Sequence, residues 1–263
     1  MQLKPGKKAI FLDLDGTIID HKSYTISPLT KEAIASAQKN GHLIVLATGR
    51  PPSLFYGIPE QLGLETIIAA NGRYVNHEGT VLYEAVIDPV LLDAFVQYVK
   101  TLGIDVAFIS GDGYAMEDHK TDLPEKFSKN FNLEIPSVIK DFHKNHNVLQ
   151  MVMFYDGNDL NAFKEAFPQL DFNVSCEYGI DINYQKGMKD IGIKKIIEHL
   201  GIKQEDTIAI GDGFNDKSMI EYAGIGVAMG NAYDPVKKAA DMVTKPVNQD
   251  GIHHAFKVLG IIK

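Results

Sequence analysis

The architecture of this chain is set by one segment, Ala9-Ile10-Phe11-Leu12-Asp13-Leu14-Asp15-Gly16. A short uninterrupted apolar run is typical of a strand that is buried on both faces, and the acidic residues and the glycine indicate where the strand ends. The segment therefore predicts an interior strand of a sheet that delivers two carboxyl groups to its C-terminal end.

Two more runs of this kind follow, at residues 42–49 and 66–72, and each ends in a polar residue and a glycine. Between the first two runs, Ser27-Pro28 precedes residues 29–40 and Gly41. An N-cap, a proline in the first turn and a closing glycine predict a helix there. Strand, helix and strand in this order form a βαβ unit, so we expect an α/β fold with a Rossmann-like parallel sheet.

The pattern changes between residues 84 and 182, where short candidates for strands and helices are mixed. We expect helices at 91–102 and 158–167 and strands at 106–110 and 148–155. A helix at 191–200 and buried strands at 207–213 and 225–230 then restore the first pattern. The sequence therefore predicts a core domain of residues 1–83 and 183–263, with an α+β domain of residues 84–182 inserted into it.

Composition limits the classes of function. The chain has 263 residues, 45% of them hydrophobic, and a formal net charge of −8. Because Arg50 and Arg73 are the only arginines and the balance is acidic, we expect no nucleic-acid partner. The single Cys176 fits a reducing compartment, and no segment has the ~18 to 20 uncharged apolar residues of a membrane helix. Since Asp13 and Asp15 also interrupt the first apolar run too early for a signal peptide, we expect a cytoplasmic protein without a membrane partner.

Polar side chains gather at the predicted ends of four strands. They are Asp13, Asp15, Thr48, Asn71, Asp212, Asn215 and Asp216. Ligands of open parallel sheets bind beyond the carboxyl ends of the strands, so we expect these side chains to share one site. Crowded carboxylates are costly unless a cation neutralises them, and oxygen ligands favour Mg²⁺, which also accepts phosphate as a ligand. Any one of these residues could instead cap a helix or form a turn, but the four aspartates together favour a metal site.

The same residues resemble the haloacid dehalogenase (HAD) superfamily of phosphohydrolases. Asp13-Leu14-Asp15-Gly16-Thr17 is similar to its first motif, and Thr48-Gly49-Arg50 is similar to its second. Residues 211–216, Gly-Asp-Gly-Phe-Asn-Asp, resemble the fourth motif in the GDGxND form of the Cof-type, type IIB subfamily. Asn71-Gly72 and residues 227–232 also match recurring segments of that subfamily. The resemblance implies a HAD core with an inserted type IIB cap domain.

The third motif of the superfamily is a lysine, and here it is less clear. The chain reads Gly187-Met188-Lys189-Asp190 where the subfamily often has Gly-Val-Ser-Lys-Gly. Counting back from residues 200–202 assigns the motif to Lys189, with Lys186 as the alternative.

The resemblance assigns chemistry to these positions. Asp13 would attack phosphorus to form an aspartyl-phosphate, and Asp15 would act first as general acid and then as general base. The resemblance places Mg²⁺ on the carboxylates of Asp13 and Asp212, the backbone carbonyl of Asp15 and, through water, Asp216. The expected phosphate-binding residues are Thr48, Lys189 and Asn215, with Asn215 orienting Lys189 or the ligands and with Arg50 and Asn71 near the phosphate or the cap.

The leading hypothesis is thus a Mg²⁺-dependent phosphatase of small phosphorylated metabolites, with sugar phosphates as the substrates that the resemblance favours. A phosphomutase of the phosphomannomutase type and a non-catalytic Mg²⁺- or phosphate-binding module are the alternatives. The sequence specifies neither the physiological substrate, the oligomeric state, the resting position of the cap nor the cap residues that select the substrate. Residues 84–182 hold 7 basic and 17 acidic side chains, and the rest of the chain holds 19 and 17, so the acidity belongs to the inserted domain.

Overall fold

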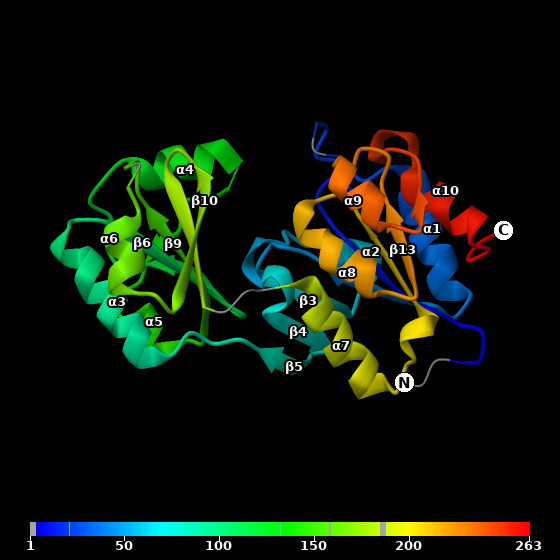
Figure 1. Ribbon diagram of the computed structural model, residues 1–263, viewed down its shortest axis with the longest axis horizontal. Coiled ribbons are helices and arrows are strands. Elements are labelled where there is room, and N and C mark those ends of the chain that lie inside the picture. Colours follow the sequence, from blue (N-terminus) through cyan, green and yellow to red (C-terminus); the bar gives the residue numbers. More distant parts are fainter. Residues whose placement is uncertain (1–3, 21, 132, 158, 185–187) are drawn as a thin grey trace. The chain divides into compact units, whose positions relative to one another are not determined.

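The computed structural model describes residues 4–20, 22–131, 133–157, 159–184 and 188–263 (Figure 1). Lys186, the alternative phosphate-binding lysine, lies outside these residues. The chain forms two compact units. Unit 1 consists of Met1–Arg50, Gly57–Tyr83 and Met188–Lys263, and unit 2 consists of Pro51–Tyr56 and Glu84–Gly187. In the part of the chain that is described, no helix has both the length and the apolar surface that crossing a membrane requires.

Unit 1 is built on an eight-stranded sheet in the order β14-β13-β12-β1-β2-β3-β4-β5. The strands are β1 (Ala9–Leu12), β2 (Leu43–Ala47), β3 (Thr66–Ala69), β4 (Tyr74–His77), β5 (Thr80–Glu84), β12 (Thr207–Gly211), β13 (Ile225–Ala228) and β14 (Met242–Val243). The six strands from β14 to β3 pair in parallel, and β4 pairs antiparallel with β3. All four residues of β1 are buried, which confirms the interior parallel strand expected from the first segment of the sequence.

Helices complete unit 1. They are α1 (Pro28–Lys39), α2 (Ile58–Leu62), α7 (Lys189–Leu200), α8 (Lys217–Tyr222), α9 (Asp234–Ala239) and α10 (Gly251–Val258). The predicted cap of α1 is confirmed, because Ser27 Oγ accepts a hydrogen bond from the backbone N of Thr30 at 3.0 Å. Helix α1 contacts α10, and α7 and α9 each contact α8 (Figure 1). Ile193 and Ile196 of α7 pack with Phe11 and Val45 of the sheet in one hydrophobic core.

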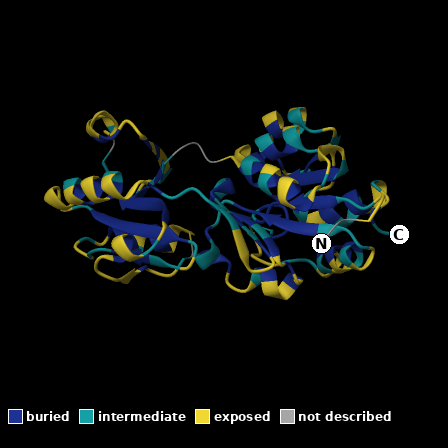
Figure 2. Cartoon of the chain, turned by 90° about the horizontal axis from the view of Figure 1, so that it is seen from below, coloured by how far each residue is buried: buried dark blue, intermediate teal, exposed yellow. Residues whose placement is uncertain are grey.

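Unit 2 has a six-stranded sheet in the order β10-β11-β9-β6-β7-β8. Its strands are β6 (Asp105–Ser110), β7 (Tyr114–Met116), β8 (Ser137–Val138), β9 (Val148–Phe154), β10 (Leu170–Cys176) and β11 (Gly179–Tyr184). Its helices are α3 (Pro89–Thr101), α4 (Leu123–Phe131), α5 (Phe142–Asn145) and α6 (Asn161–Ala166). Helices α3, α5 and α6 contribute to one hydrophobic core, and α4 contributes to a second core on the opposite sheet face. Figure 2 shows buried strands and helices with exposed outer faces in both units.

The extent of unit 2 differs from the division expected at residues 84 and 182. It also includes Pro51–Tyr56 and all of β11. The reason for the later end is that β11 pairs with both β9 and β10, so Asn183 and Tyr184 belong to the same sheet as the residues before them.

Candidate active site

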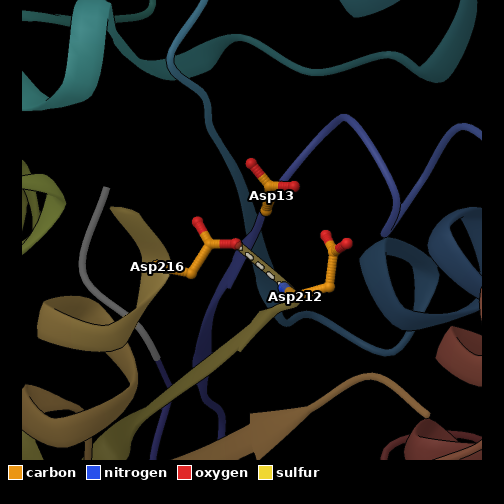
Figure 3. Close-up of side chains that lie close together, drawn as sticks. All are labelled: Asp13, Asp212 and Asp216. Atoms are coloured by element: carbon orange, nitrogen blue, oxygen red, sulfur yellow. Dashed lines mark hydrogen bonds between the residues drawn. The ribbon is translucent and has the colours of Figure 1, made fainter. Parts of the chain in front are cut away.

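Three carboxyl groups meet beyond the C-terminal ends of two neighbouring strands (Figure 3). Asp13 follows β1, Asp212 follows β12, and Asp216 ends the short 3-10 helix η4 (Phe214–Asp216). One oxygen of each carboxylate lies within 4.8 Å of the other two, and all three residues are buried. The structure thus brings together three of the side chains that the strand pattern predicted would share a site.

Lys189 joins this cluster from the start of α7. The residue is 0% exposed. Its Nζ donates to Asp13 Oδ1 at 2.5 Å and also to Asp216 Oδ1. Burial alone would lower the pKa of Lys189, but the charges of Asp13 and Asp216 outweigh burial and hold its pKa above the ordinary value. The side chain is therefore a buried ammonium at neutral pH.

The charges of the cluster do not balance without a cation. Burial, followed by the charge of Asp216, raises the pKa of Asp13 well above its ordinary value, although Lys189 acts in the opposite direction. When ionised, the three carboxylates leave two negative charges uncompensated by Lys189. A divalent cation would cancel that excess, and a donor set made only of oxygens suits Mg²⁺. The residues present therefore fit the metal that the resemblance implies.

Asp212 is held by residues from two other loops. Thr17 Oγ1 donates to Asp212 Oδ1 at 3.1 Å, and Asn231 Nδ2 lies 3.0 Å from Asp212 Oδ2 and 2.9 Å from the carbonyl oxygen of Gly16. Gly16 has φ +89°, and a Cβ atom there would lie 2.2 Å from Asp212 Oδ2, so a larger residue would displace the carboxylate. Sequence reasoning did not assign Thr17 or Asn231 to the site, although both lie in segments that carried the resemblance.

Asp216 stabilises its own loop through hydrogen bonds and also forms an ion pair with Lys189. Its Oδ2 accepts a hydrogen bond from the backbone N of Asp212 at 2.9 Å (Figure 3) and another from the backbone N of Gly213 at 2.8 Å. Its Oδ1 accepts from Lys189 Nζ. A Cβ atom at Gly211 would lie 2.5 Å from Asp216 Cγ. The glycines of this loop therefore leave space for a carboxylate that shapes the turn and also faces the cluster.

Asp15 forms a bidentate ion pair with Arg50. Arg50 Nε donates to Asp15 Oδ2 at 2.8 Å, and Nη2 donates to Oδ1 at 2.5 Å. The side chains of Asp15 and Arg50 are 32% and 22% exposed, so both groups remain accessible to a ligand. The backbone N of Arg50 donates to Oγ1 of the buried Thr48 at 3.0 Å, which fixes the loop after β2. Arg50 was expected near the phosphate or the cap, and in this structure it binds the predicted general acid.

The remaining two candidates bind each other. Asn215 Nδ2 donates to Asn71 Oδ1 at 2.9 Å, and Asn71 has the left-handed φ of 53°. The sequence analysis suggested that Asn215 orients Lys189 or the ligands, but among the described residues the hydrogen-bond partners of Lys189 Nζ are Asp13 and Asp216. Gly72 packs against the segment before α7, where a Cβ atom would lie 2.4 Å from the carbonyl oxygen of Met188. The loop of Asn71 thus supports the start of α7 through its backbone.

Known proteins resemble this chain over most of its length. Residues 10–256 match the family described as haloacid dehalogenase-like hydrolase. YkrA of Bacillus subtilis (strain 168) is 36% identical over 258 residues, which cover 97% of this chain and 99% of YkrA. YkrA is itself named only provisionally as a phosphatase. A hypothetical protein of Geobacillus kaustophilus HTA426 has a TM-score of 0.94 at 31% identity, covering 98% of this chain and 100% of that one. BT4131, described as a HAD subclass IIB sugar phosphatase, has a TM-score of 0.79 at 30% identity, covering 97% of this chain and 100% of BT4131.

Proposed function

The chain belongs to the haloacid dehalogenase-like hydrolases, and from that premise we propose that it transfers the phosphoryl group of a small phosphate monoester first to Asp13 and then to water. The observation that carries the proposal is the contact of Asp13 with a fully buried ammonium, Lys189, beside two further carboxylates at the strand ends. A buried carboxylate held next to a fixed cation is a suitable nucleophile for an anionic phosphate ester, because the cation offsets the repulsion between the two anions.

Mg²⁺ is the cofactor that we propose. The carboxylates of Asp13 and Asp212 and the backbone carbonyl of Asp15 would hold it, with Asp216 acting through a water molecule. When bound, the ion supplies positive charge that offsets repulsion between nucleophile and substrate and that stabilises the transferring phosphoryl group. Thr17 and Asn231 contribute by fixing the two oxygens of Asp212 before any ion arrives.

In the first half of the reaction, a carboxylate oxygen of Asp13 forms a bond to phosphorus while the bond from phosphorus to the leaving oxygen breaks. Asp15, entering in its protonated form, gives its proton to the leaving oxygen, so that an alcohol departs. Lys189 holds a phosphoryl oxygen as a point charge. Thr48 Oγ1, which accepts from the backbone N of Arg50, keeps its own proton to donate to another phosphoryl oxygen.

In the second half, Asp15 as carboxylate takes a proton from a water molecule, whose oxygen attacks phosphorus. The bond between phosphorus and Asp13 breaks, which returns Asp13 as a carboxylate and releases inorganic phosphate. Arg50 is a positioning residue in this reaction, because its guanidinium group binds both oxygens of Asp15.

Small phosphorylated metabolites, with sugar phosphates first among them, are the substrates that we propose. The likeness to BT4131, a sugar phosphatase, supports the substrate class. We further propose that unit 2 serves as the type IIB cap and that its residues select the leaving group. The fold of unit 2, a sheet with helices inserted between β5 and α7, supports that role.

Release of inorganic phosphate from a panel of sugar phosphates with Mg²⁺ tests the function. Asp13→Asn keeps the shape of the side chain but removes the nucleophilic charge, and we expect turnover to fall by about a thousandfold or more. Asp234→Asn, a variant of an exposed aspartate at the start of α9, is the matched control and should leave turnover unchanged. Equal activity in the two variants would refute the proposed nucleophile.

A further inference from the structure

An exposed pair of aromatic rings joins two loops of unit 1. Phe214 begins the 3-10 helix η4, two residues after Asp212 in the sequence, and Tyr233 immediately precedes α9. Their ring centroids are 4.5 Å apart and the ring planes are inclined by 21°, which is a stacked arrangement. Phe214 is 61% exposed and Tyr233 is 58% exposed, so burial in the hydrophobic core of unit 1 does not account for their contact.

Each ring belongs to a loop that holds Asp212. The first, the Asp212 loop, consists of residues 212–216 after β12, and Oδ2 of its Asp216 accepts from the backbone N of Asp212 at 2.9 Å (Figure 3). The second, the Asn231 loop, consists of residues 229–233 after β13, and Nδ2 of its Asn231 donates to Asp212 Oδ2 at 3.0 Å. The ring contact therefore links the loop that carries the carboxylate to a loop that donates to it.

The backbone contact beside the rings is weak. The backbone N of Tyr233 lies 3.4 Å from the carbonyl oxygen of Asp212, which exceeds the usual length of about 2.9 to 3.0 Å for an N–H···O bond. Stacked rings make many atomic contacts at once, and an aromatic pair stabilises by more than the apolar area that it buries. The rings therefore strengthen the connection between the loops at the point where the backbone contact is long.

The Asn231 loop is itself fixed to the rest of unit 1. Asn231 Oδ1 accepts a hydrogen bond from the backbone N of Val247 at 2.8 Å. The carbonyl oxygen of Tyr233 accepts from the backbone N of Val236 at 2.9 Å and of Lys237 at 3.1 Å, which ties Tyr233 to the first turn of α9. Val236 is fully buried in the hydrophobic core that includes the sheet. The Asn231 loop is therefore a fixed support, against which the other loop packs.

The Asp212 loop needs a support because it carries two of the three clustered carboxylates, those of Asp212 and Asp216. One oxygen of each carboxylate in the cluster lies within 4.8 Å of the other two, so the ionised groups repel one another until a cation binds. Thr17 and Asn231, which bind the two oxygens of Asp212, are neutral and cannot cancel that repulsion. A contact that keeps the loop in place before the ion binds lowers the cost of ordering the site and so raises the affinity for the ion.

We propose that Phe214 and Tyr233 are positioning residues for Mg²⁺, because their stack holds the Asp212 loop against the Asn231 loop. Both rings act through the carboxylate of Asp212 and need no contact with the ion or the substrate. Phe214 occupies the x position of the GDGxND form, which the motif leaves open. The inference rests on the proposed Mg²⁺-dependent function and deepens it by naming two surface residues that set the affinity for the metal.

Calorimetric titration of the full chain with Mg²⁺ tests the inference without reference to turnover. Phe214→Ala and Tyr233→Ala should each raise the Kd for Mg²⁺ by about three- to tenfold, a factor that corresponds to the stabilisation of one aromatic pair. The double variant should raise the Kd no further than the larger of the two single variants, because either substitution already removes the same contact.

Two further variants separate the stack from other causes. Tyr233→Phe keeps the ring and removes the hydroxyl, so its Kd should stay within about twofold of the native value. Val258→Ala removes an exposed apolar side chain from α10 and is the control, with an unchanged Kd. Urea unfolding in EDTA should show one cooperative transition for every variant, since both rings are exposed and no core loses a side chain.

Three results would overturn the inference. They are a native Kd in both single alanine variants, losses that multiply in the double variant, and a Tyr233→Phe variant that loses as much affinity as Tyr233→Ala. Each of them, obtained while the native protein binds Mg²⁺ and releases phosphate from a sugar phosphate, would leave the proposed phosphatase function standing. If the native protein binds no Mg²⁺, the proposed cofactor fails and the inference fails with it.

Discussion

The stability of the metal-free protein should depend strongly on Lys189. Lys189→Met keeps the length of the side chain but removes the ammonium that binds both Asp13 and Asp216. Since the lysine and both carboxylates are buried, the variant leaves two uncompensated charges beside Asp212. Loss of one partner from a buried ion pair costs about 3 to 5 kcal/mol, and we expect a loss of this size in unfolding free energy.

The assay is urea unfolding with EDTA and, separately, with Mg²⁺ at saturating concentration. A ligand at about one hundred times its Kd adds about 2.7 kcal/mol to stability, so Mg²⁺ should recover a large part of the loss. Mg²⁺ should also raise the unfolding free energy of Lys189→Met, whose cluster has three carboxylates and no lysine, by more than it raises that of the native protein.

Lys194→Met is the matched control on the same helix. Lys194 is half exposed and pairs with Asp190 one turn away, an interaction worth about 0.3 to 0.5 kcal/mol. A loss below about 1 kcal/mol for Lys189→Met in EDTA, or a loss equal to that of Lys194→Met, would refute the charge balance derived for the cluster.

Three further predictions follow from individual contacts. The pKa of Asp13 is raised in the folded state, so between the ordinary pKa of 3.8 and the raised pKa the metal-free native state binds more protons than the unfolded state. The unfolding free energy of the metal-free protein should therefore fall as pH rises through that window. Asp13→Asn should flatten the dependence of the urea-unfolding free energy on pH there. Asn231→Ala removes a donor to Asp212 and should weaken Mg²⁺ binding about 10- to 100-fold by calorimetry, a result that unchanged affinity would contradict. Arg50→Ala should lower kcat for p-nitrophenyl phosphate by about tenfold, because it removes the guanidinium group that binds both oxygens of Asp15. A change in KM alone would instead assign Arg50 to substrate binding.

Much of the core could be predicted because local pattern and topology agree there. The apolar runs before Asp13 and Asp212 end in carboxylates, and parallel neighbouring strands necessarily end at one edge of the sheet. Ser27 and Pro28 likewise marked the start of α1 without reference to the rest of the fold.

Unit 2 was predicted less completely, in part because its edge strand β10 has only one buried face. Leu170 and Phe172 of β10 are buried, while Asp171 and Asn173, which alternate with them, are exposed. That alternation is a strand signal over a short segment, and the polar half of it obscured the assignment. The strands β7, β8 and β11 and the helices α4 and α5 were missed for the same reason or because they are short.

The contacts that organise the site could not be read from spacing. Thr17 binds Asp212 across 195 positions, and Arg50 binds Asp15 across 35. Such pairs depend on how loops from different strands pack, which hydrophobic pattern does not encode. By contrast, Lys189 was located by counting back from the end of its helix, and the structure places it in contact with Asp13.

Chemical trapping at Asp13 tests the central claim most directly. Asp15→Asn removes the base of the second step, while p-nitrophenyl phosphate has a leaving group that departs without a general acid. An acyl-phosphate should therefore accumulate in this variant with Mg²⁺. Reduction of the quenched protein with borohydride converts an aspartyl-phosphate to homoserine, which peptide mass spectrometry locates. We predict homoserine at position 13, whereas phosphate release with an unmodified Asp13, or with label at another residue, would contradict the proposed mechanism.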